Sequence, residues 1–258
     1  MRDFDGKIVL VTGASTGLGA ALAVGAAARG AKAVIINYAK SKAEAEATAE
    51  AVRAAGAEAV LAQGDVSEND DCINIAEAAA KFGRIDALAN NAGTTKQVPN
   101  HANLDGLTRE DFERIYAVNV IGAYQMVRAL VPLIERSGGG AIVNVSSIAS
   151  MMGTGSSLAY MASKGALNAL SVGLARSLAP QIRVNAIAPG LVETPWMEKG
   201  LGAGRYAATV AGYRGRAALD AVITPEDVAE AAWFLGVAAA KTTGEVLLLD
   251  AGLRLRRD

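Results

Sequence analysis

The chain has 258 residues, and its 25 lysines and arginines nearly balance its 26 aspartates and glutamates, giving a formal net charge of −1. This balance leaves no basic surplus for a phosphate backbone or an anionic membrane, so nucleic acid and membranes are poor candidate partners. The single cysteine, Cys72, excludes an internal disulfide and a thiolate cluster, and the single histidine, His101, excludes zinc sites built on paired histidines. We find no secretory signal pattern and no apolar run of the roughly 20 residues that span a membrane, so we expect a soluble, cytoplasmic protein.

Short apolar segments alternate with helical segments along the chain. Runs rich in Val, Ile, Leu and Ala predict strands at residues 7–12, 33–38, 57–63, 85–89, 141–146, 183–187 and 246–249. The predicted helices lie at residues 17–29, 41–55, 67–82, 108–135, 158–178 and 225–235. Ser41, Thr108 and Thr224 are expected to cap three of these helices, and Gly30 and Gly56 are expected to end two of them.

Strands without polar alternation, separated by helices, indicate a parallel sheet with helices on both faces. The sequence therefore predicts an α/β fold, a single doubly wound Rossmann-type domain over residues 1–258 with a seven-stranded, mostly parallel sheet. The stretch 195–220 is partly helical, interrupted by glycines and without a partner strand. We expect it to lie over the site as a substrate lid.

A glycine-rich turn joins the first predicted strand to the first predicted helix. It reads Thr12-Gly13-Ala14-Ser15-Thr16-Gly17-Leu18-Gly19. Gly13 permits a tight turn, while Gly17 and Gly19 let a pyrophosphate and the sheet approach the backbone. The helix N-terminus then offers free N–H groups to the anion. The turn is therefore predicted to bind a dinucleotide.

The same turn also contains the G-x-S-x-G pattern of an α/β-hydrolase, with Ser15 as the nucleophile. That mechanism needs a histidine, and His101 is the one candidate, in a polar stretch that reads as a loop. Only one strand precedes Ser15, which leaves little sheet to present a nucleophile. We therefore favour cofactor binding over hydrolysis.

Tyr160 and Lys164 are spaced i, i+4 near the start of a predicted helix, so their side chains share one helical face. A nearby ammonium lowers the pKa of a phenol from about 10, which suits the phenol for general acid–base chemistry. The same spacing occurs at Tyr38 and Lys42, but only Tyr160 follows a strand-end serine, Ser147. Ser147 is predicted to lie at the carboxyl edge of the sheet, where doubly wound folds bind ligands.

With these residues in place, the chain resembles the classical short-chain dehydrogenase/reductase (SDR) family over nearly its whole length. Thr12 to Gly19 match the TGxxxGxG cofactor turn of that family, and an NNAG segment follows the fourth predicted strand. The catalytic tetrad of the family is matched, in order and spacing, by Asn119, Ser147, Tyr160 and Lys164. The segment that holds the nicotinamide carboxamide is matched by Pro189, Gly190, Val192 and Thr194.

The resemblance implies a role for each of these residues. Tyr160 would exchange a proton with the substrate oxygen, and Lys164 would lower the pKa of Tyr160 and hold the nicotinamide ribose. Ser147 would bind the substrate carbonyl, and Asn119 would hold a water that links Lys164 to solvent. No metal is implied. The residues implied to bind the cofactor are Gly13, Ser15, Thr16, Gly17, Leu18, Gly19, Asn37, Tyr38, Asp65, Val66, Asn91, Ala92, Gly93, Tyr160, Lys164, Pro189, Gly190, Val192 and Thr194.

The residues after the second predicted strand bear on the choice between NAD(H) and NADP(H). NAD enzymes of this type usually carry an acid there, bonded to the ribose 2′-hydroxyl. This chain has no acid in that segment, and Lys40, Ser41 and Lys42 could receive a 2′-phosphate. Against this, Thr16 stands where many NADP(H)-preferring relatives have Arg. The sequence leans to NADP(H) and leaves NAD(H) open.

The expected substrate is a hydrophobic ketone or secondary alcohol, interconverted by hydride transfer. The stretches 94–105 and 195–220 are predicted to line its pocket. An apolar wall would include Met151, Met152, Leu191, Trp196, Met197, Tyr206 and Tyr213. The substrate is expected to contact Ser147, Tyr160 and Met197.

Two other functions stay open. A 3-oxoacyl-thioester (acyl-carrier-protein) reductase, within the same family, would need a basic patch for its acidic partner, and the lid offers Arg205, Arg214 and Arg216. A non-catalytic, cofactor-binding sensor would be favoured by loss of a tetrad member, and all four members are present. The resemblance also implies a homotetramer that acts on a small-molecule carbonyl or alcohol.

Overall fold

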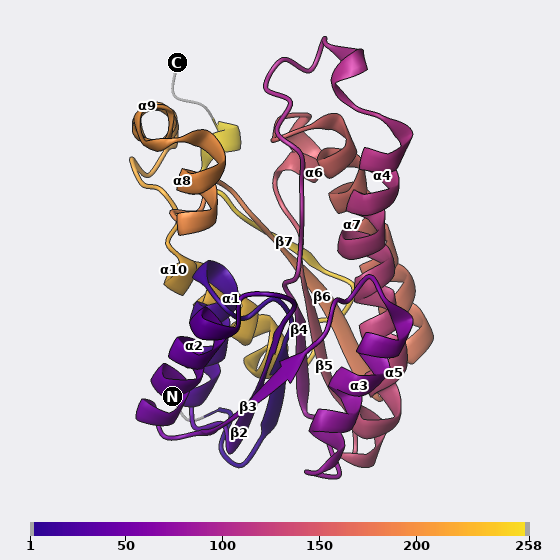
Figure 1. Ribbon diagram of the computed structural model, residues 1–258. Helices are drawn as coiled ribbons and strands as arrows, with labels where there is room; N and C mark the ends of the chain where they lie inside the picture. The colour runs from indigo at the N-terminus through magenta and orange to yellow at the C-terminus, as the bar shows by residue number, and fades with distance from the viewer. Residues whose placement is uncertain (1–2, 256–258) are drawn as a thin grey trace.

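Seven parallel strands form one sheet at the centre of the protein (Figure 1). The computed structural model describes residues 3–255, apart from the side chains of residues 195, 196 and 199. The strands are β1 (Ile8–Val11), β2 (Ala33–Tyr38), β3 (Glu58–Gln63), β4 (Ala87–Asn90), β5 (Gly140–Val145), β6 (Ile182–Pro189) and β7 (Val246–Leu249). In space their order is β3-β2-β1-β4-β5-β6-β7, with parallel pairing throughout. The predicted doubly wound Rossmann-type fold is confirmed.

Helices cover both faces of the sheet. They are α1 (Gly17–Ala28), α2 (Lys42–Ala54), α3 (Asn69–Ala80), α4 (Arg109–Tyr116), α5 (Ala123–Arg136), α6 (Ala149–Met152), α7 (Leu158–Leu178), α8 (Pro195–Leu201), α9 (Ala203–Arg214) and α10 (Pro225–Trp233). Helices α1, α2 and α10 pack on one face, and α3, α5 and α7 on the other (Figure 1). Helices α6, α8 and α9 lie beyond the carboxyl ends of the strands.

Alternate residues of each strand supply the two cores. Val9 and Val11 of β1 pack with α1, α2 and α10, whereas Ile8 and Leu10 pack with α3, α5 and α7. All four side chains are buried. A strand that is covered on both faces has no polar side, which explains why the sequence shows apolar runs instead of alternation.

The strand order reverses between β1 and β4. The chain moves outward through β2 and β3 and then crosses to the other side of β1 for β4. The connections after β1 and β4 therefore diverge to opposite faces and leave a crevice at the carboxyl ends of these strands. Here Asn91 N donates to Thr12 Oγ1 at 3.0 Å, across 79 positions of the sequence. The topology thus joins the glycine turn to the NNAG segment.

The helix predicted at 108–135 is interrupted. It begins with the expected capping box between Thr108 and Asp111, but a π-helical segment, Ala117–Gly122, separates α4 from α5. A π segment widens one turn of the helix, and an apolar period of 3.6 residues does not reveal it. The helix predicted at 225–235 likewise changes to a π segment after Trp233.

The helical stretch Arg109–Arg136, taken through the π segment, is long and apolar enough to cross a membrane by length and composition, and its apolar window of 18 residues has a mean hydropathy of 1.4. Its longest run without a charged residue is 115–127, so the expectation that apolar runs are shorter than a membrane span stands for this stretch. Its inner side chains pack beneath the sheet, among them Met126, Leu130 and Ile134. A core helix of a globular domain passes the same test of length and composition.

Candidate active site

A cavity of about 1080 Å³ lies at the carboxyl ends of the strands. Residues from the glycine turn, the ends of the strands, α7 and the lid line it. All the residues that the resemblance implies for cofactor binding contribute to this lining, as do the three expected to contact the substrate, Ser147, Tyr160 and Met197. Asn119 is the one member of the predicted tetrad outside it. The fold therefore gathers residues 13 to 197 around one space, large enough for a dinucleotide and a small substrate.

Two asparagines hold the glycine turn in shape. Asn37 Oδ1 accepts from Gly13 N at 3.1 Å, and its Nδ2 donates to two main-chain carbonyls at the end of β3. Asn91 Nδ2 donates to the carbonyls of Thr12 and Gly13, each at 3.0 Å. The Asn37 side chain is 1% exposed, so it shapes the turn from behind. Sequence reasoning placed both residues at the cofactor site but did not find this bracing.

The N-terminus of α1 opens towards the cavity. In the described structure Thr16 precedes α1 without a side-chain cap bond, which leaves the first N–H groups available to an anion. Gly13 has a φ of +60°, a conformation that favours glycine. A Cβ atom on Gly19 would overlap the carbonyl oxygen of Gly13. The turn thus presents backbone donors without side-chain bulk, which fits a pyrophosphate.

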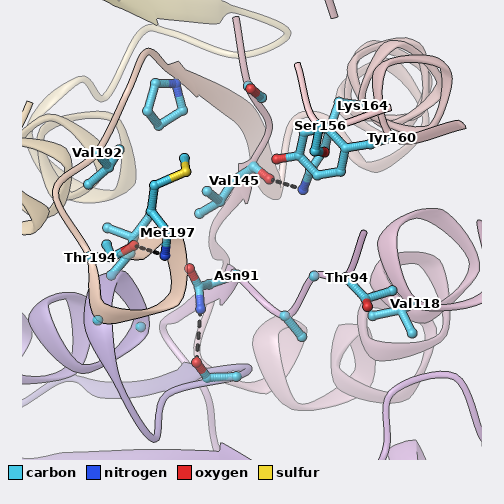
Figure 2. A pocket seen from close by; sticks show the side chains of 18 of the residues that line it. Asn91, Thr94, Val118, Val145, Ser156, Tyr160, Lys164, Val192, Thr194 and Met197 are labelled. Carbon is cyan, nitrogen blue, oxygen red and sulfur yellow. Dashed lines mark hydrogen bonds between the residues drawn. The ribbon is translucent and has the colours of Figure 1, made fainter. Parts of the chain in front are cut away.

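Strand β5 and helix α7 bring the catalytic candidates together. Ser157 caps α7 by accepting from Tyr160 N at 3.2 Å, and Lys164 follows one helical turn later. Lys164 Nζ donates to the carbonyl of Val145 at 2.7 Å and lies 5.7 Å from the centre of the Tyr160 ring (Figure 2). The hydroxyl of Ser147 lies close enough to that of Tyr160 to lower its pKa as a hydrogen-bonding group. Three of the four predicted catalytic residues therefore form one cluster.

The orientation of Ser147 is set by the main chain. Ser147 Oγ accepts from Ala149 N at 3.2 Å. A hydroxyl that accepts one bond keeps its proton for another acceptor. The proton is therefore available to the oxygen of Tyr160 or to a carbonyl oxygen beside it.

Burial shifts the pKa of both titratable groups in the cluster. Burial raises the pKa of Tyr160, and the hydroxyl of Ser147 lowers it by a smaller amount. Burial lowers the pKa of Lys164 from 10.5 to about 8. The expected lowering of the Tyr160 pKa by Lys164 is not what this geometry produces. The amine lies over the ring and donates to a main-chain carbonyl, and loss of water outweighs the favourable bond at the phenol.

Asn119 lies in the π segment and braces the loop after β4. Its Oδ1 accepts from Thr94 N at 2.8 Å, and its Nδ2 donates to Thr94 O at 3.0 Å and to Ser163 Oγ at 2.9 Å. Asn119 therefore ties this loop to α7 beside Lys164. The water relay that the resemblance implies stays a prediction, because Asn119 Oδ1 accepts one hydrogen bond here and can accept a second from a water.

The predicted apolar wall is only partly present. Leu191, Met197 and Tyr213 line the cavity, and Figure 2 shows Met197 on the side opposite Tyr160. Met151, Met152 and Tyr206 are outside the lining, and the side chain of Trp196 lies outside the described residues. The two methionines belong to α6, an unpredicted single turn of helix that turns them towards solvent.

Polar residues also line the substrate half of the cavity, one of them in the predicted stretch 94–105. Gln97 follows β4, while Thr154 and Ser156 precede α7, and all three line the cavity. Ser156 Oγ is 2.6 Å from Thr95 Oγ1, so the two loops that carry these residues are joined. The substrate half of the cavity is thus lined by hydroxyl-bearing side chains as well as by apolar ones.

The contacts of His101 argue against the hydrolase interpretation. His101 Nε2 lies 3.0 Å from the carbonyl oxygen of Gly155, in the loop before α7, and Ser15 lies in the glycine turn. Within residues 3–255 no three His, Cys, Asp or Glu side chains are grouped to hold a metal ion. At the end of β5 and the start of α7 the cavity offers a phenol, a hydroxyl and an amine.

A comparison with protein-family models matches residues 7–202 to the short chain dehydrogenase family. The chain belongs to the short-chain dehydrogenase/reductase family. The match runs from the residue before β1 to the end of α8, so it includes the glycine turn and the Ser147, Tyr160 and Lys164 cluster. The protein is accordingly an oxidoreductase of a family that uses a nicotinamide dinucleotide.

Similar proteins extend this relationship over the whole chain. The "Granaticin polyketide synthase putative ketoacyl reductase 2" of Streptomyces violaceoruber is 41% identical, over 97% of each chain. The L-rhamnose 1-dehydrogenase (NAD(P)(+)) of Sphingomonas sp. is 37% identical, over 98% of each chain. The crystal structure of "a putative short-chain dehydrogenase/reductase from Burkholderia xenovorans" has 40% identity and a TM-score of 0.90, and the match covers 97% of this chain and 98% of that one.

We predict that burial of Lys164 makes folding stability depend on pH. Between about pH 8 and 10.5 the unfolded chain binds a proton at this amine that the folded chain does not, so the free energy of unfolding rises with pH in that window. Relative to a Lys164→Met variant, the Tm of the wild type should increase by roughly 5 °C between pH 7 and pH 10. Circular dichroism melts of both proteins at four pH values measure this difference, and parallel pH profiles would contradict the prediction.

Proposed function

We propose that this protein interconverts a ketone and a secondary alcohol with NAD(P)(H), using Tyr160 as the general acid and base. The observation that carries the proposal is the shared cavity. The phenol of Tyr160, the hydroxyl of Ser147 and the amine of Lys164 lie with the open N-terminus of α1 around the same space. A phenol beside a dinucleotide site suits proton exchange coupled to hydride transfer.

The residues of the chain divide the chemistry among them. A bound nicotinamide supplies or accepts the hydride at the carbon of the substrate. In reduction, Ser147 donates a hydrogen bond to the carbonyl oxygen, and Tyr160 donates the proton that converts this oxygen to a hydroxyl. Lys164 lies within reach of the Tyr160 ring to hold a ribose hydroxyl and to stabilise the phenolate that remains. Oxidation of an alcohol runs through the same groups in reverse.

Replacement of Tyr160 by Phe should lower kcat at least about 100-fold, because the ring is kept and only the proton donor is removed. The affinity for NADPH, measured by quenching of its fluorescence, should change less than threefold. Tyr116→Phe, at the end of α4 and outside the cavity lining, is the matched control and should behave as the wild type. Substantial turnover by Tyr160→Phe would refute the mechanism. This result would also separate an enzyme from a sensor that only binds the cofactor.

For the cofactor we propose NADP(H). Lys40 and Ser41 are exposed and line the cavity beyond the end of β2, where a 2′-phosphate would lie. Lys42 instead pairs with Glu46 at 3.8 Å, on the first turns of α2, and is outside the cavity lining. Lys40 is therefore the lysine of this segment best placed to meet the phosphate.

Replacement of Lys40 by Ala should raise KM for NADPH by about tenfold and leave KM for NADH unchanged, because only the 2′-phosphate uses this charge. Lys42→Ala is the control and should leave both values unchanged. Initial rates with the two coenzymes measure the effect. A wild-type kcat/KM that is higher for NADH than for NADPH would contradict the proposal.

A second candidate substrate, a 3-oxoacyl thioester, is favoured by one arginine. Of the three arginines that the sequence offered, Arg216 lines the cavity, while Arg214 pairs with Glu193 at 3.6 Å and Arg205 is outside the lining. The Nε of Arg216 donates to the carbonyl of Gly212, which holds the guanidinium at the rim. A charge at this rim could bind the phosphate or carboxylate of a substrate tail.

Replacement of Arg216 by Gln should raise KM for acetoacetyl-coenzyme A by about tenfold, because a charge-assisted bond is lost, and should leave KM for acetophenone unchanged. Arg205→Gln is the control for net charge of the lid. Equal effects on both ketones would remove the reason to prefer a thioester.

We also propose a cytoplasmic homotetramer. Ile121, Tyr124 and Val172 are 45–50% exposed on the outer face of the π segment, α5 and α7. Exposed apolar side chains at this density suit a subunit interface. Light scattering that gives the mass of a monomer, about 26.3 kDa, would contradict this assembly.

A further inference from the structure

Helix α6 follows the catalytic serine and is too short to hold its own position. It has four residues, Ala149–Met152, and ends at Gly153, whose φ is +65°. A single helical turn gains too few hydrogen bonds to be stable alone. The position of Ser147, just before this turn, must therefore be set by contacts with other elements.

One chain of hydrogen bonds joins this turn to α7. Asn168 Nδ2 donates to Ser150 Oγ at 2.9 Å, and Ser150 Oγ donates to the carbonyl oxygen of Ser147 at 2.6 Å. The same carbonyl also accepts from Ser150 N at 3.1 Å. Two adjacent bonds of this kind polarise each other and strengthen the chain. The main chain at Ser147 is therefore held from α7 through one intermediate hydroxyl.

Asn168 continues a stripe of functional side chains on α7. Tyr160, Lys164 and Asn168 are spaced by four residues, so they share one face of the helix. One rigid helix thus carries the proton donor, the amine beside it and the amide that reaches the turn after Ser147. A shift of α6 relative to α7 would change the distance between the hydroxyls of Ser147 and Tyr160.

The amide of Asn168 is not explained by stability alone. Its Oδ1 is buried and, among the described residues, accepts no hydrogen bond. An unpaired buried acceptor costs stability, which an apolar side chain of similar size would avoid. The group that the amide does bond leads directly to Ser147.

We propose that Asn168 and Ser150 are positioning residues that hold Ser147 at hydrogen-bonding distance from Tyr160. They contact neither substrate nor cofactor, and they act through the main chain of Ser147. The inference rests on the proposed function, because it assigns these residues to the reaction of Tyr160 and Ser147.

The test measures reduction of the ketone that the wild type turns over fastest among acetophenone, cyclohexanone and acetoacetyl-coenzyme A, with saturating NADPH. Asn168→Leu and the milder Ser150→Ala should each lower kcat by about three- to tenfold, with KM for NADPH unchanged. The Tm of Asn168→Leu should equal or exceed that of the wild type. Ser150→Thr keeps the hydroxyl and should restore most of the activity.

A double variant tests whether the two residues act through one chain. Asn168→Leu with Ser150→Ala should be no slower than the slower single variant. In alcohol oxidation, the midpoint of the rise of kcat with pH should move to higher pH in both single variants, because the bond that lowers the Tyr160 pKa is loosened. Wild-type kcat values, or losses that simply add, would overturn the inference.

A matched control lies one turn further along α7. Ser171 Oγ accepts from Asn144 Nδ2 of β5 at 2.8 Å, so α7 makes a second amide–hydroxyl bond there, but this bond does not lead to Ser147. Ser171→Ala should lower the Tm and leave kcat unchanged. If the wild type reduced none of the three ketones, or if Tyr160→Phe kept its activity, the proposed function itself would be refuted. An inactive Tyr160→Phe beside fully active Asn168→Leu would refute only the positioning role.

Discussion

The junction between the end of β5 and α7 is the constraint on which the site depends. Three consecutive residues at this junction lie against α7. Val145 accepts from Lys164 Nζ, Ser146 donates to Lys164 O, and Ser147 lies beside the hydroxyl of Tyr160. Because β5 is a central strand and α7 a long helix, neither can shift without disturbing the core. Burial of the Lys164 amine at this junction disfavours its charged form, which lowers its pKa to about 8.

Asparagine amides supply most of the remaining rigidity. Asn37 and Asn91 brace the glycine turn from β2 and β4, and Asn119 braces the loop after β4 from the π segment. Each amide bonds main-chain groups that a loop would otherwise leave without partners. The cofactor half of the cavity is therefore preorganised by side chains that a cofactor does not need to touch.

The substrate half is built differently. The lid is fixed at its base, where Tyr213 donates to the carbonyl of Asp250 at 2.7 Å and packs against Gly190. Its first helix, α8, is capped by Thr194, in the segment expected to hold the nicotinamide. The lid thus meets the cofactor site through short, fixed contacts. Its inner residues, such as Met197, remain free to differ among relatives that act on different substrates.

The sequence by itself determined the fold class, most element boundaries and the residues around the cavity. Strands buried on both faces leave continuous apolar runs, and the glycine turn needs small residues at fixed positions. Both features can therefore be recognised in the sequence. The i, i+4 spacing of Tyr160 and Lys164 likewise follows from the geometry of a helix.

Only the tertiary structure decided how these groups are tuned. Burial raised the pKa of Tyr160 where spacing alone predicted a lower value, because the water lost by the phenol is invisible in the sequence. The π segment at Asn119, the outward methionines of α6 and the bond from Asn168 towards Ser147 depend on contacts between distant segments. A local pattern records which side chains are near along the chain, and these features depend on which are near in space.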